Sequence, residues 1–354
     1  MRVLSRLLLF ISQRQNAANS NTSEVVRMSF PLGKMRAVLA FFFVILAVNF
    51  MAAQKPLVTP GGDKVPNGKH STSGQTAAPV QDPTGQAVVT GNGISYHGGP
   101  VLKSNPVPIY LIFYGNWSST GSNTQASVSL IEHFISTLGN TPYEHIATTY
   151  GDTTGNVSGN VSLGGVTFVN SSTNLTDTSL RTTVSNAISS GALPRNGNGV
   201  YMVLSSSNIN ETSGFCTQYC GFHTHASLGG VDIKYGFVGN PDRCPSGCEI
   251  QRTGPNSPAT NVGGADGLIN VLAHEQFEAI TDPDLNAWFD SSGQEDSDKC
   301  NFNFGTTSTC TSTSICSAAG KSAGARFNVT FGNNDWMIQQ QWENAAGGKC
   351  VLHL

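Results

Sequence analysis

Charged side chains are scarce in this chain of 354 residues: they form 12% of the sequence, about half the ordinary share. The formal net charge is only -3, so the composition gives no reason to expect nucleic acid or an anionic membrane as a partner. Several enzyme motifs are also missing. There is no GxSxG after a predicted strand, which argues against a serine hydrolase, and no GxGxxG or GxxxxGK(S/T) spacing for phosphate binding.

The N-terminal part resembles a secretory leader. An apolar run from Ala37 to Ala53 follows Lys34 and Arg36 and ends in small residues, which predicts a signal peptide cleaved near Ala53. The alternative is a membrane anchor, although the run is short for a comfortable span. We expect an N-terminal extension and signal peptide over 1–53, a flexible Gly/Pro/Ser/Thr linker over 54–93, and one folded domain over 94–354.

Secretion agrees with the cysteines and the glycosylation motifs. Eight cysteines follow the predicted signal, and an even number in a secreted chain predicts disulfides. We expect sequence neighbours to pair and Cys300 to bridge to Cys350, while a zinc knot is the alternative for the two CxxxC pairs. The neighbours are Cys216 with Cys220, Cys244 with Cys248, and Cys310 with Cys316. Asn-x-Ser/Thr acceptors occur at Asn116, Asn156, Asn160, Asn170, Asn174, Asn210 and Asn328.

Strand and helix patterns alternate through the domain. Unbroken apolar runs predict buried strands over Ile109–Tyr114 and Val200–Ser205, and helical spacing predicts helices over Val128–Leu138 and Leu180–Ile188. Short alternating segments over 150–170 favour hairpins, and the alternating run 336–342 favours a strand that packs in the core. The expected fold is α/β (mixed α+β), a single layered, disulfide-bonded domain.

One further segment, about Gly267 to Thr281, carries the candidate chemistry. Its apolar residues recur every three or four positions, which predicts a helix with one buried stripe. His274 and Glu278 are four residues apart and therefore share a helix face. The pattern is the HExxH zinc helix with Glu in place of the second His.

The predicted metal ligands are His274, Glu278 and a downstream carboxylate, Glu295. Carboxylate oxygens ligate zinc as imidazole does, and Glu275 would be the general base that takes a proton from the attacking water. By analogy with zincins, Asp298 would orient His274 from behind. Zinc is the expected metal of this zincin-like helix.

Other interpretations remain open. HExxE can be an ordinary solvated helix face. The nearby Asp282, Asp284, Asp290 and Asp296 would suit calcium. His97, His223 and His225 are alternative ligands in loops; His223, after a CxxxC loop, is the reserve ligand.

The chain resembles the plant EXORDIUM, or phosphate-induced protein, family, in order from about Tyr96 to Cys350. The resemblance implies a secreted apoplastic or cell-wall protein linked to growth and cell expansion, with HExxE and ExxDxC motifs at His274–Glu278 and Glu295–Cys300 and no established reaction. This chain departs from it at Thr281–Pro283 and at Cys310 and Cys316. The matching segments are 96–101, 109–118, 214–223, 237–240, 244–248, 266–269, 273–275 and 286–289.

Two functions therefore stand. The first is an extracellular growth-regulatory protein that acts by binding an unknown cell-wall partner, with no membrane contact after signal cleavage. The second is a zinc metallohydrolase that cleaves peptides with Glu275 as base.

Overall fold

The structure is a computed structural model that describes residues 92–251, 254–256, 264–311, 316 and 324–354. The predicted extension and signal peptide, and nearly all of the predicted linker, lie outside the described residues. In the described part of the chain, every helix is too short or too polar to cross a bilayer.

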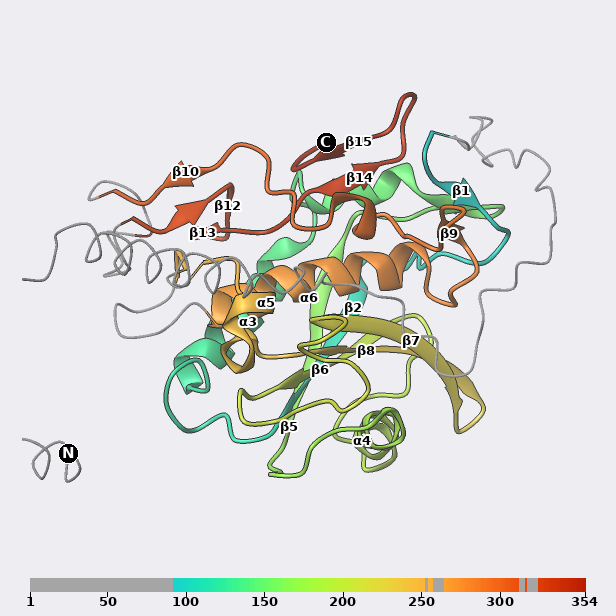
Figure 1. The fold of residues 1–354 in the computed structure, drawn as a ribbon. Coiled ribbons are helices and arrows are strands. Elements are labelled where there is room, and N and C mark those ends of the chain that lie inside the picture. The colour runs from blue at the N-terminus through green and yellow to red at the C-terminus, as the bar shows by residue number, and fades with distance from the viewer. Residues whose placement is uncertain (1–91, 252–253, 257–263, 312–315, 317–323) are drawn as a thin grey trace, which may run out of the picture. The chain divides into compact units, whose positions relative to one another are not determined.

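A five-stranded mixed sheet forms the centre of the fold, in the order β5-β2-β6-β8-β7 (Figure 1). The first four strands are parallel, and the edge strand β7 runs antiparallel to β8. The two strands predicted from apolar runs are confirmed as β2 and β6. The bounds are β2 (Val107–Tyr114), β5 (Val161–Val169), β6 (Val200–Ser205), β7 (Gly221–Leu228) and β8 (Val231–Val238).

Helices cover both faces of this sheet. On one face lie α3 (Gln125–Leu138) and α6 (Gly264–Thr281), which contact each other, and α4 (Asp177–Ser189) lies on the opposite face (Figure 1). Threonine side chains accept a hydrogen bond from the first turn of α3 and of α4, as N-caps do. The predicted α/β layering is therefore confirmed.

The central helix α6 is buried on every side. All of its 18 residues are buried, so the prediction of a single buried stripe was wrong. The sheet covers one side, while η1 (Glu144–Thr149) and the C-terminal segments cover the other (Figure 1). One hydrogen bond holds the C-terminal segments to α6: the backbone N–H of Gln339 donates to the side chain of Asn270 at 2.8 Å.

Two local predictions need correction. The region 150–170 holds one hairpin, β3 (Gly151–Asp152) with β4 (Gly155–Asn156), but its second half is the long strand β5, because it pairs in parallel with β2. The run 336–342 is divided between the short strands β13 (Asn334–Trp336) and β14 (Gln341–Glu343). The irregular residues between them include Gln339, which turns toward α6.

The remaining elements are short. A β1–β9 pair joins the start of the described chain to the segment after α6, and the C-terminal part consists of two-stranded hairpins. The short elements not yet given bounds are β1 (Ser95–Tyr96), η2 (Pro241–Arg243), α5 (Pro245–Cys248), β9 (Trp288–Phe289), η3 (Asp298–Cys300), β10 (Ser308–Thr309), β11 (Arg326–Phe327), β12 (Val329–Phe331) and β15 (Lys349–Val351).

The disulfides differ in part from the predicted pairing. Cys300–Cys350 and Cys310–Cys316 are confirmed. The two CxxxC loops do not close on themselves: Cys216 pairs with Cys244 and Cys220 with Cys248, which also excludes a zinc knot there. We call these two bonds the double disulfide. Because each CxxxC segment presents its cysteines four residues apart, two such segments lying side by side can form two parallel bonds.

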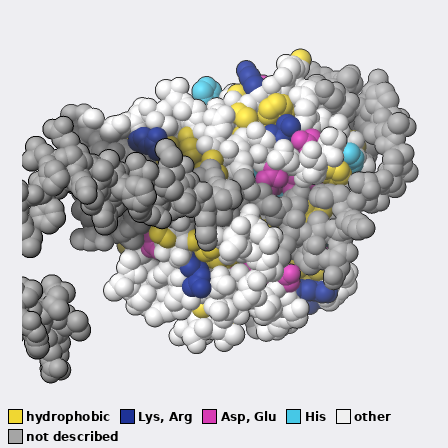
Figure 2. Space-filling model, in the orientation of Figure 1, with side chains coloured by type: hydrophobic (Ala, Val, Ile, Leu, Met, Phe, Trp, Pro, Cys, Tyr) yellow, Lys and Arg dark blue, Asp and Glu magenta, His cyan; other side chains and the backbone are white. Residues whose placement is uncertain are grey.

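The surface carries few charges, as the composition requires. Figure 2 shows one face on which acidic and basic side chains are scattered and form no patch of one sign.

Of the glycosylation acceptors, Asn116, Asn156, Asn170 and Asn174 are exposed. Asn328 is different, because its amide nitrogen donates to two backbone carbonyls, at 2.9 and 2.6 Å.

Candidate metal centre

The helix α6 places the two motif residues side by side. Nε2 of His274 lies 3.0 Å from Oε1 of Glu278, and neither side chain is more than 1% exposed. Within the described part of the chain, this buried Nε2 makes no hydrogen bond; its neighbours are carboxylate oxygens. A buried ring nitrogen without a hydrogen bond is costly unless it is charged or binds a ligand.

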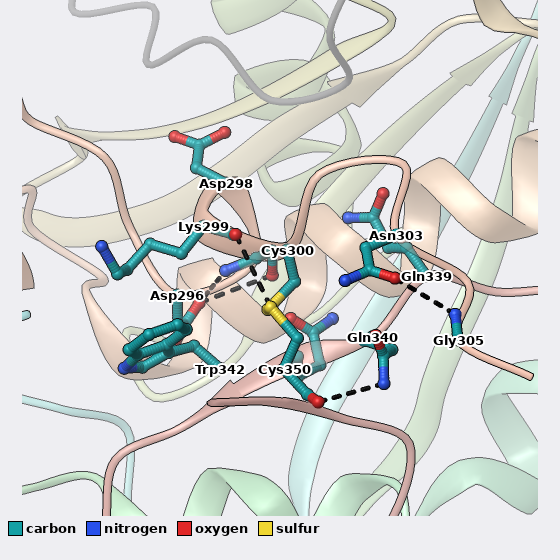
Figure 3. The surroundings of a disulfide bond; sticks show 12 residues. Asp296, Asp298, Lys299, Cys300, Asn303, Gly305, Gln339, Gln340, Trp342 and Cys350 are labelled. Atoms are coloured by element: carbon teal, nitrogen blue, oxygen red, sulfur yellow. Dashed lines mark hydrogen bonds between the residues drawn. A yellow bond between two sulfur atoms is a disulfide. The ribbon is translucent and has the colours of Figure 1, made fainter. Parts of the chain in front are cut away.

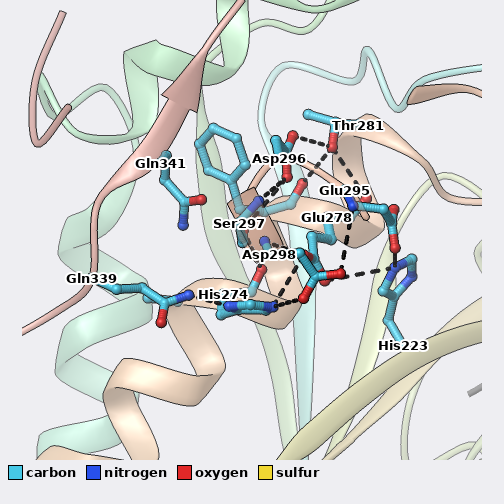
Figure 4. A network of polar contacts seen from close by, with 12 residues as sticks. His223, His274, Glu278, Thr281, Glu295, Asp296, Ser297, Asp298, Gln339 and Gln341 are labelled. Carbon is cyan, nitrogen blue, oxygen red and sulfur yellow. Dashed lines mark hydrogen bonds and ion pairs between the residues drawn. The ribbon is translucent and has the colours of Figure 1, made fainter. Parts of the chain in front are cut away.

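The edge strand β7 brings a second histidine to the same place. Nε2 of His223 lies 2.9 Å from Oε2 of Glu295 and 4.0 Å from Oε2 of Glu278 (Figure 4). His223 is therefore a central member of the cluster rather than a reserve. In the sequence, the only signal for His223 was its place after the CxxxC loop, because the hairpin of β7 and β8 was not expected.

The segment 295–300 closes the cluster from the side of the C-terminal cover. The backbone N–H of Asp298 donates to Oε1 of Glu278 at 3.1 Å, and Oδ1 of Asp298 lies 3.6 Å from Nε2 of His274. The disulfide Cys300–Cys350 attaches this segment to β15 (Figure 3). This disulfide keeps the segment, and with it Asp298, next to α6.

The neighbouring lysine does not neutralise the cluster. Nζ of Lys299 donates to Oδ2 of Asp290 at 3.3 Å. It also lies 4.8 Å from the ring centroid of Trp342, and both of these side chains are drawn in Figure 3. The adjacent positions 298 and 299 therefore face different surroundings, and only the carboxylate faces the histidine.

One predicted role needs correction. Asp298 was expected to orient His274 from behind, but it lies on the Nε2 side, where a metal would bind. The other ring nitrogen, Nδ1, is in contact with the amide group of Gln339. Gln339 thus takes the orienting position. Sequence reasoning missed it because its alternating neighbours indicated a strand with core packing.

Electrostatics favour a positive charge at this site. Burial is the largest single effect on the pKa of His274 and lowers it, but the charge and contact of Glu278, the contact of Asp298 and the charge of Glu275 together outweigh burial, so the pKa lies well above its usual range. The pKa of Glu278 is also raised well above normal, by burial first, with the charge of His274 acting against it and that of Asp298 adding to it. In the absence of a cation, the cluster would take up protons.

The predicted base lies beside the cluster. A carboxylate oxygen of Glu275 lies within 4.8 Å of ligand atoms of His274 and Glu278, and the side chain is buried. Room for it comes from Gly221 at the start of β7, where an added Cβ would lie 2.8 Å from Oε1 of Glu275 and 2.7 Å from Val271.

A second polar network lies near the site, and of its carboxylates sequence reasoning considered only Asp296, as a possible calcium ligand. Glu144 in η1 is buried, and its Oε2 accepts a hydrogen bond from Gln276 at 3.1 Å. Asp296 accepts a hydrogen bond from Thr281 at 2.6 Å. Burial raises the pKa of Glu144 to about 8 and that of Asp296 to about 7.

The four aspartates considered for calcium do not form one cluster. Asp282 accepts hydrogen bonds from the backbone after α6, Asp284 pairs with Lys234 at 2.5 Å, and Asp290 accepts from the backbone of its own turn. Only Asp296 is adjacent to the site, and there it bonds to a threonine. Their dispersal weakens the calcium interpretation.

The other two candidate histidines lie outside the cluster. His97 stacks on Phe289 with ring centroids 3.7 Å apart, a local packing role. His225 is part of a half-exposed group, with Nδ1 2.9 Å from Asp232 and 3.8 Å from Asp284. We call these three residues the outer group; Lys234 already pairs with both of its carboxylates.

Together these features define a class of protein: a disulfide-bonded α/β domain with a buried histidine and carboxylate cluster between its central helix and the sheet edge. Residues 94–352 match the conserved region of phosphate-induced protein 1, and the chain belongs to that family. The expected resemblance is thereby confirmed, while the zincin-like interpretation of HExxE stays a prediction.

Two curated relatives come from Arabidopsis thaliana. Protein EXORDIUM-like 5 is 31% identical over 222 residues, which cover 55% of this chain and 59% of the relative. Protein EXORDIUM-like 3 is 31% identical over 223 residues, which cover 55% of this chain and 64% of the relative. The chain thus spans about three fifths of the length of these relatives. No solved structure matches.

Proposed function

We propose that this protein acts outside the cell, at the cell wall, in the regulation of growth and cell expansion, and that its buried cluster binds a divalent metal ion. Kinship with the EXORDIUM-like proteins supports the growth role. The four disulfides support an extracellular location, since such bonds persist in oxidising compartments. In this proposal the buried cluster binds the metal ion, and the surface of the protein binds the cell-wall partner.

One observation carries the metal site: two imidazoles and three carboxylates converge in a buried space. The predicted ligands His274, Glu278 and Glu295 all belong to it, and the geometry adds His223 and Asp298. Buried charges of one sign are expensive unless they are paired or coordinate a metal. Two imidazoles among the donors favour zinc over calcium, which prefers oxygen ligands alone.

The test is elemental analysis of the secreted protein purified without chelator. We expect at least one zinc ion per chain, and at least one ion fewer per chain in His274→Ala. The matched control is His97→Ala, which removes a histidine that stacks on Phe289 away from the cluster and should leave the metal content unchanged. Absence of metal from the wild-type protein would reject the proposal.

A second candidate, a zinc-dependent peptidase, rests on the position of Glu275. Its carboxylate is near both motif ligands, where it can accept a proton from an attacking water. A bound zinc would supply Lewis acidity toward a peptide carbonyl. We rank this function second because the ligand side chains are buried, and a closed site is typical of structural zinc.

Glu275→Gln separates the two candidates. Loss of the base should lower any peptidase activity by about 100-fold to 10,000-fold while the metal stays bound. Full activity of the variant in a plant growth assay, with metal content unchanged, would exclude catalysis and leave the binding function.

A further inference from the structure

The two oxygens of Glu278 serve different histidines. Oε1 lies 3.0 Å from His274, whereas Oε2 faces His223 at 4.0 Å (Figure 4). The carboxylate therefore stands between the two rings, closer to His274 than to His223. This arrangement is typical of a carboxylate that bridges two cations.

Each side of the bridge has its own ligand set. On one side, His274 and Oε1 of Glu278 are joined by Oδ1 of Asp298, which lies 3.6 Å from the ring nitrogen. On the other side, His223 and Oε2 of Glu278 are joined by Glu295 at 2.9 Å. Ligand atoms that bind one zinc at about 2 Å lie about 3–4 Å from each other, and these distances fall in that range.

Two candidate ligand groups fall on the same two sides, although the group around His274 contains Glu275 in place of Asp298. The ligand atoms of His223, Glu278 and Glu295 all lie within 4.8 Å of one another, as do those of His274, Glu275 and Glu278. Glu278 is the residue common to both groups, and each group contains one histidine. A single ion would have to leave one of the two histidines outside its reach.

We propose that the cluster binds two divalent cations bridged by Glu278, an inference that rests on the metal-binding function proposed above. The buried Nε2 of His274, which makes no hydrogen bond in the described part of the chain, points toward the first position. With Glu275 included, the cluster has four carboxylates, whose charge two divalent cations neutralise and one cation only halves. Paired metal sites in proteins hold their ions about 3.5–4 Å apart, a spacing that one carboxylate can bridge.

The donor set indicates which ions fit. Each position has one imidazole and carboxylate oxygens, a mixture that suits zinc or manganese. Asp298, with 9% of its side chain exposed, is the ligand nearest to solvent and marks the side from which an ion can enter. The ion on the His274 side would exchange first.

The first experiment counts ions in the full secreted chain. The protein is stripped with chelator, titrated with zinc alone by calorimetry, and checked by elemental analysis after dialysis. We expect two ions per chain. One ion per chain would overturn the paired site while the metal-binding function survives, and no ion would reject both.

Variants then locate the ions. His223→Ala and His274→Ala should each retain one ion, and Glu278→Gln, which keeps the shape of the bridge, should retain less than one. The matched control is His225→Ala, on the same strand as His223 but in the outer group. Loss of an ion in this control would place the second ion in the outer group and refute the bridge.

A spectroscopic readout needs no variant. Manganese-loaded wild-type protein should give the exchange-coupled resonance signal of two neighbouring ions. The signal of isolated manganese at a loading of two ions would refute a shared carboxylate.

Circular dichroism of each variant, compared with the wild-type spectrum, shows whether an ion is lost because a ligand is missing or because the variant does not fold.

Discussion

Stability should fall as the pH rises, because the network near the site buries a protonated acid. Glu144 is fully buried, and burial raises its pKa from 4.5 to about 8; the bond from Gln276 opposes this shift and the charge of Asp296 adds to it. The folded protein therefore keeps a proton that the unfolded chain releases above pH 4.5. The stabilisation is fully present below that pH and is lost as the pH rises through about 8.

The magnitude follows from the size of the shift. One pKa unit corresponds to about 1.4 kcal/mol, so the whole window corresponds to about 5 kcal/mol of unfolding free energy. Glu144→Gln keeps an oxygen that can accept the hydrogen bond from Gln276 and carries no charge at any pH. The variant should match the wild type near pH 5 and exceed its stability near pH 9 by several kcal/mol.

Urea unfolding followed by tryptophan fluorescence, with the same metal loading in both proteins, measures this difference. Glu132→Gln is the matched control, since Glu132 lies on α3 and is only partly buried. Parallel pH profiles for the wild type and Glu144→Gln would refute the assignment of the proton to Glu144.

Three further outcomes are expected. Gly221→Ala should lower stability by about 1–3 kcal/mol in thermal unfolding, since the new methyl group would overlap Glu275; an unchanged melting temperature would contradict this. Removing one bond of the double disulfide should lower the free energy of unfolding only slightly, whereas removing both should lower it by about 3–4 kcal/mol, because each bond closes nearly the same 28-residue loop. Equal and additive losses of the two bonds in denaturant titrations would contradict this. Mass spectrometry of glycopeptides should find sugar on Asn116 but none on Asn328, whose amide is occupied; a glycan on Asn328 in folded protein would contradict this.

The main elements of the fold could be predicted because their signals are local. The apolar runs of β2 and β6 and the helical spacing in α3 and α4 each lie within one short segment. The strand β5 was missed since its glycines and polar residues resemble hairpins, and only its parallel pairing with β2 makes it a strand. Pairing between distant segments leaves no periodic trace in either one.

The site was predictable to the extent that the helix supplies it. His274, Glu275 and Glu278 are neighbours through helix geometry alone, and the downstream motif led to Glu295. The role of Asp298 was assigned wrongly, because the ring nitrogen that it faces depends on how two segments meet.

Residues from other parts of the chain were predicted less well, since His223 was named only as a reserve ligand and Gln339 was not assigned to the site. His223 enters through the β7–β8 pairing, and Gln339 through an irregular stretch between two short strands. The pairing of the two CxxxC segments was wrong for a related reason: spacing shows which cysteines are near in sequence, whereas bonds between the two segments require them to lie side by side.

The complete burial of α6 has a consequence for how this protein can evolve. A helix with a solvent-exposed face can accumulate neutral substitutions there, but α6 has no such face. Every change on α6 that tunes the cluster also alters the packing of the central layer, so new chemistry and lower stability would arise in the same step. Variation in function is therefore expected to come first from the segments that approach this helix, the start of β7 and residues 295–298, and last from the helix itself.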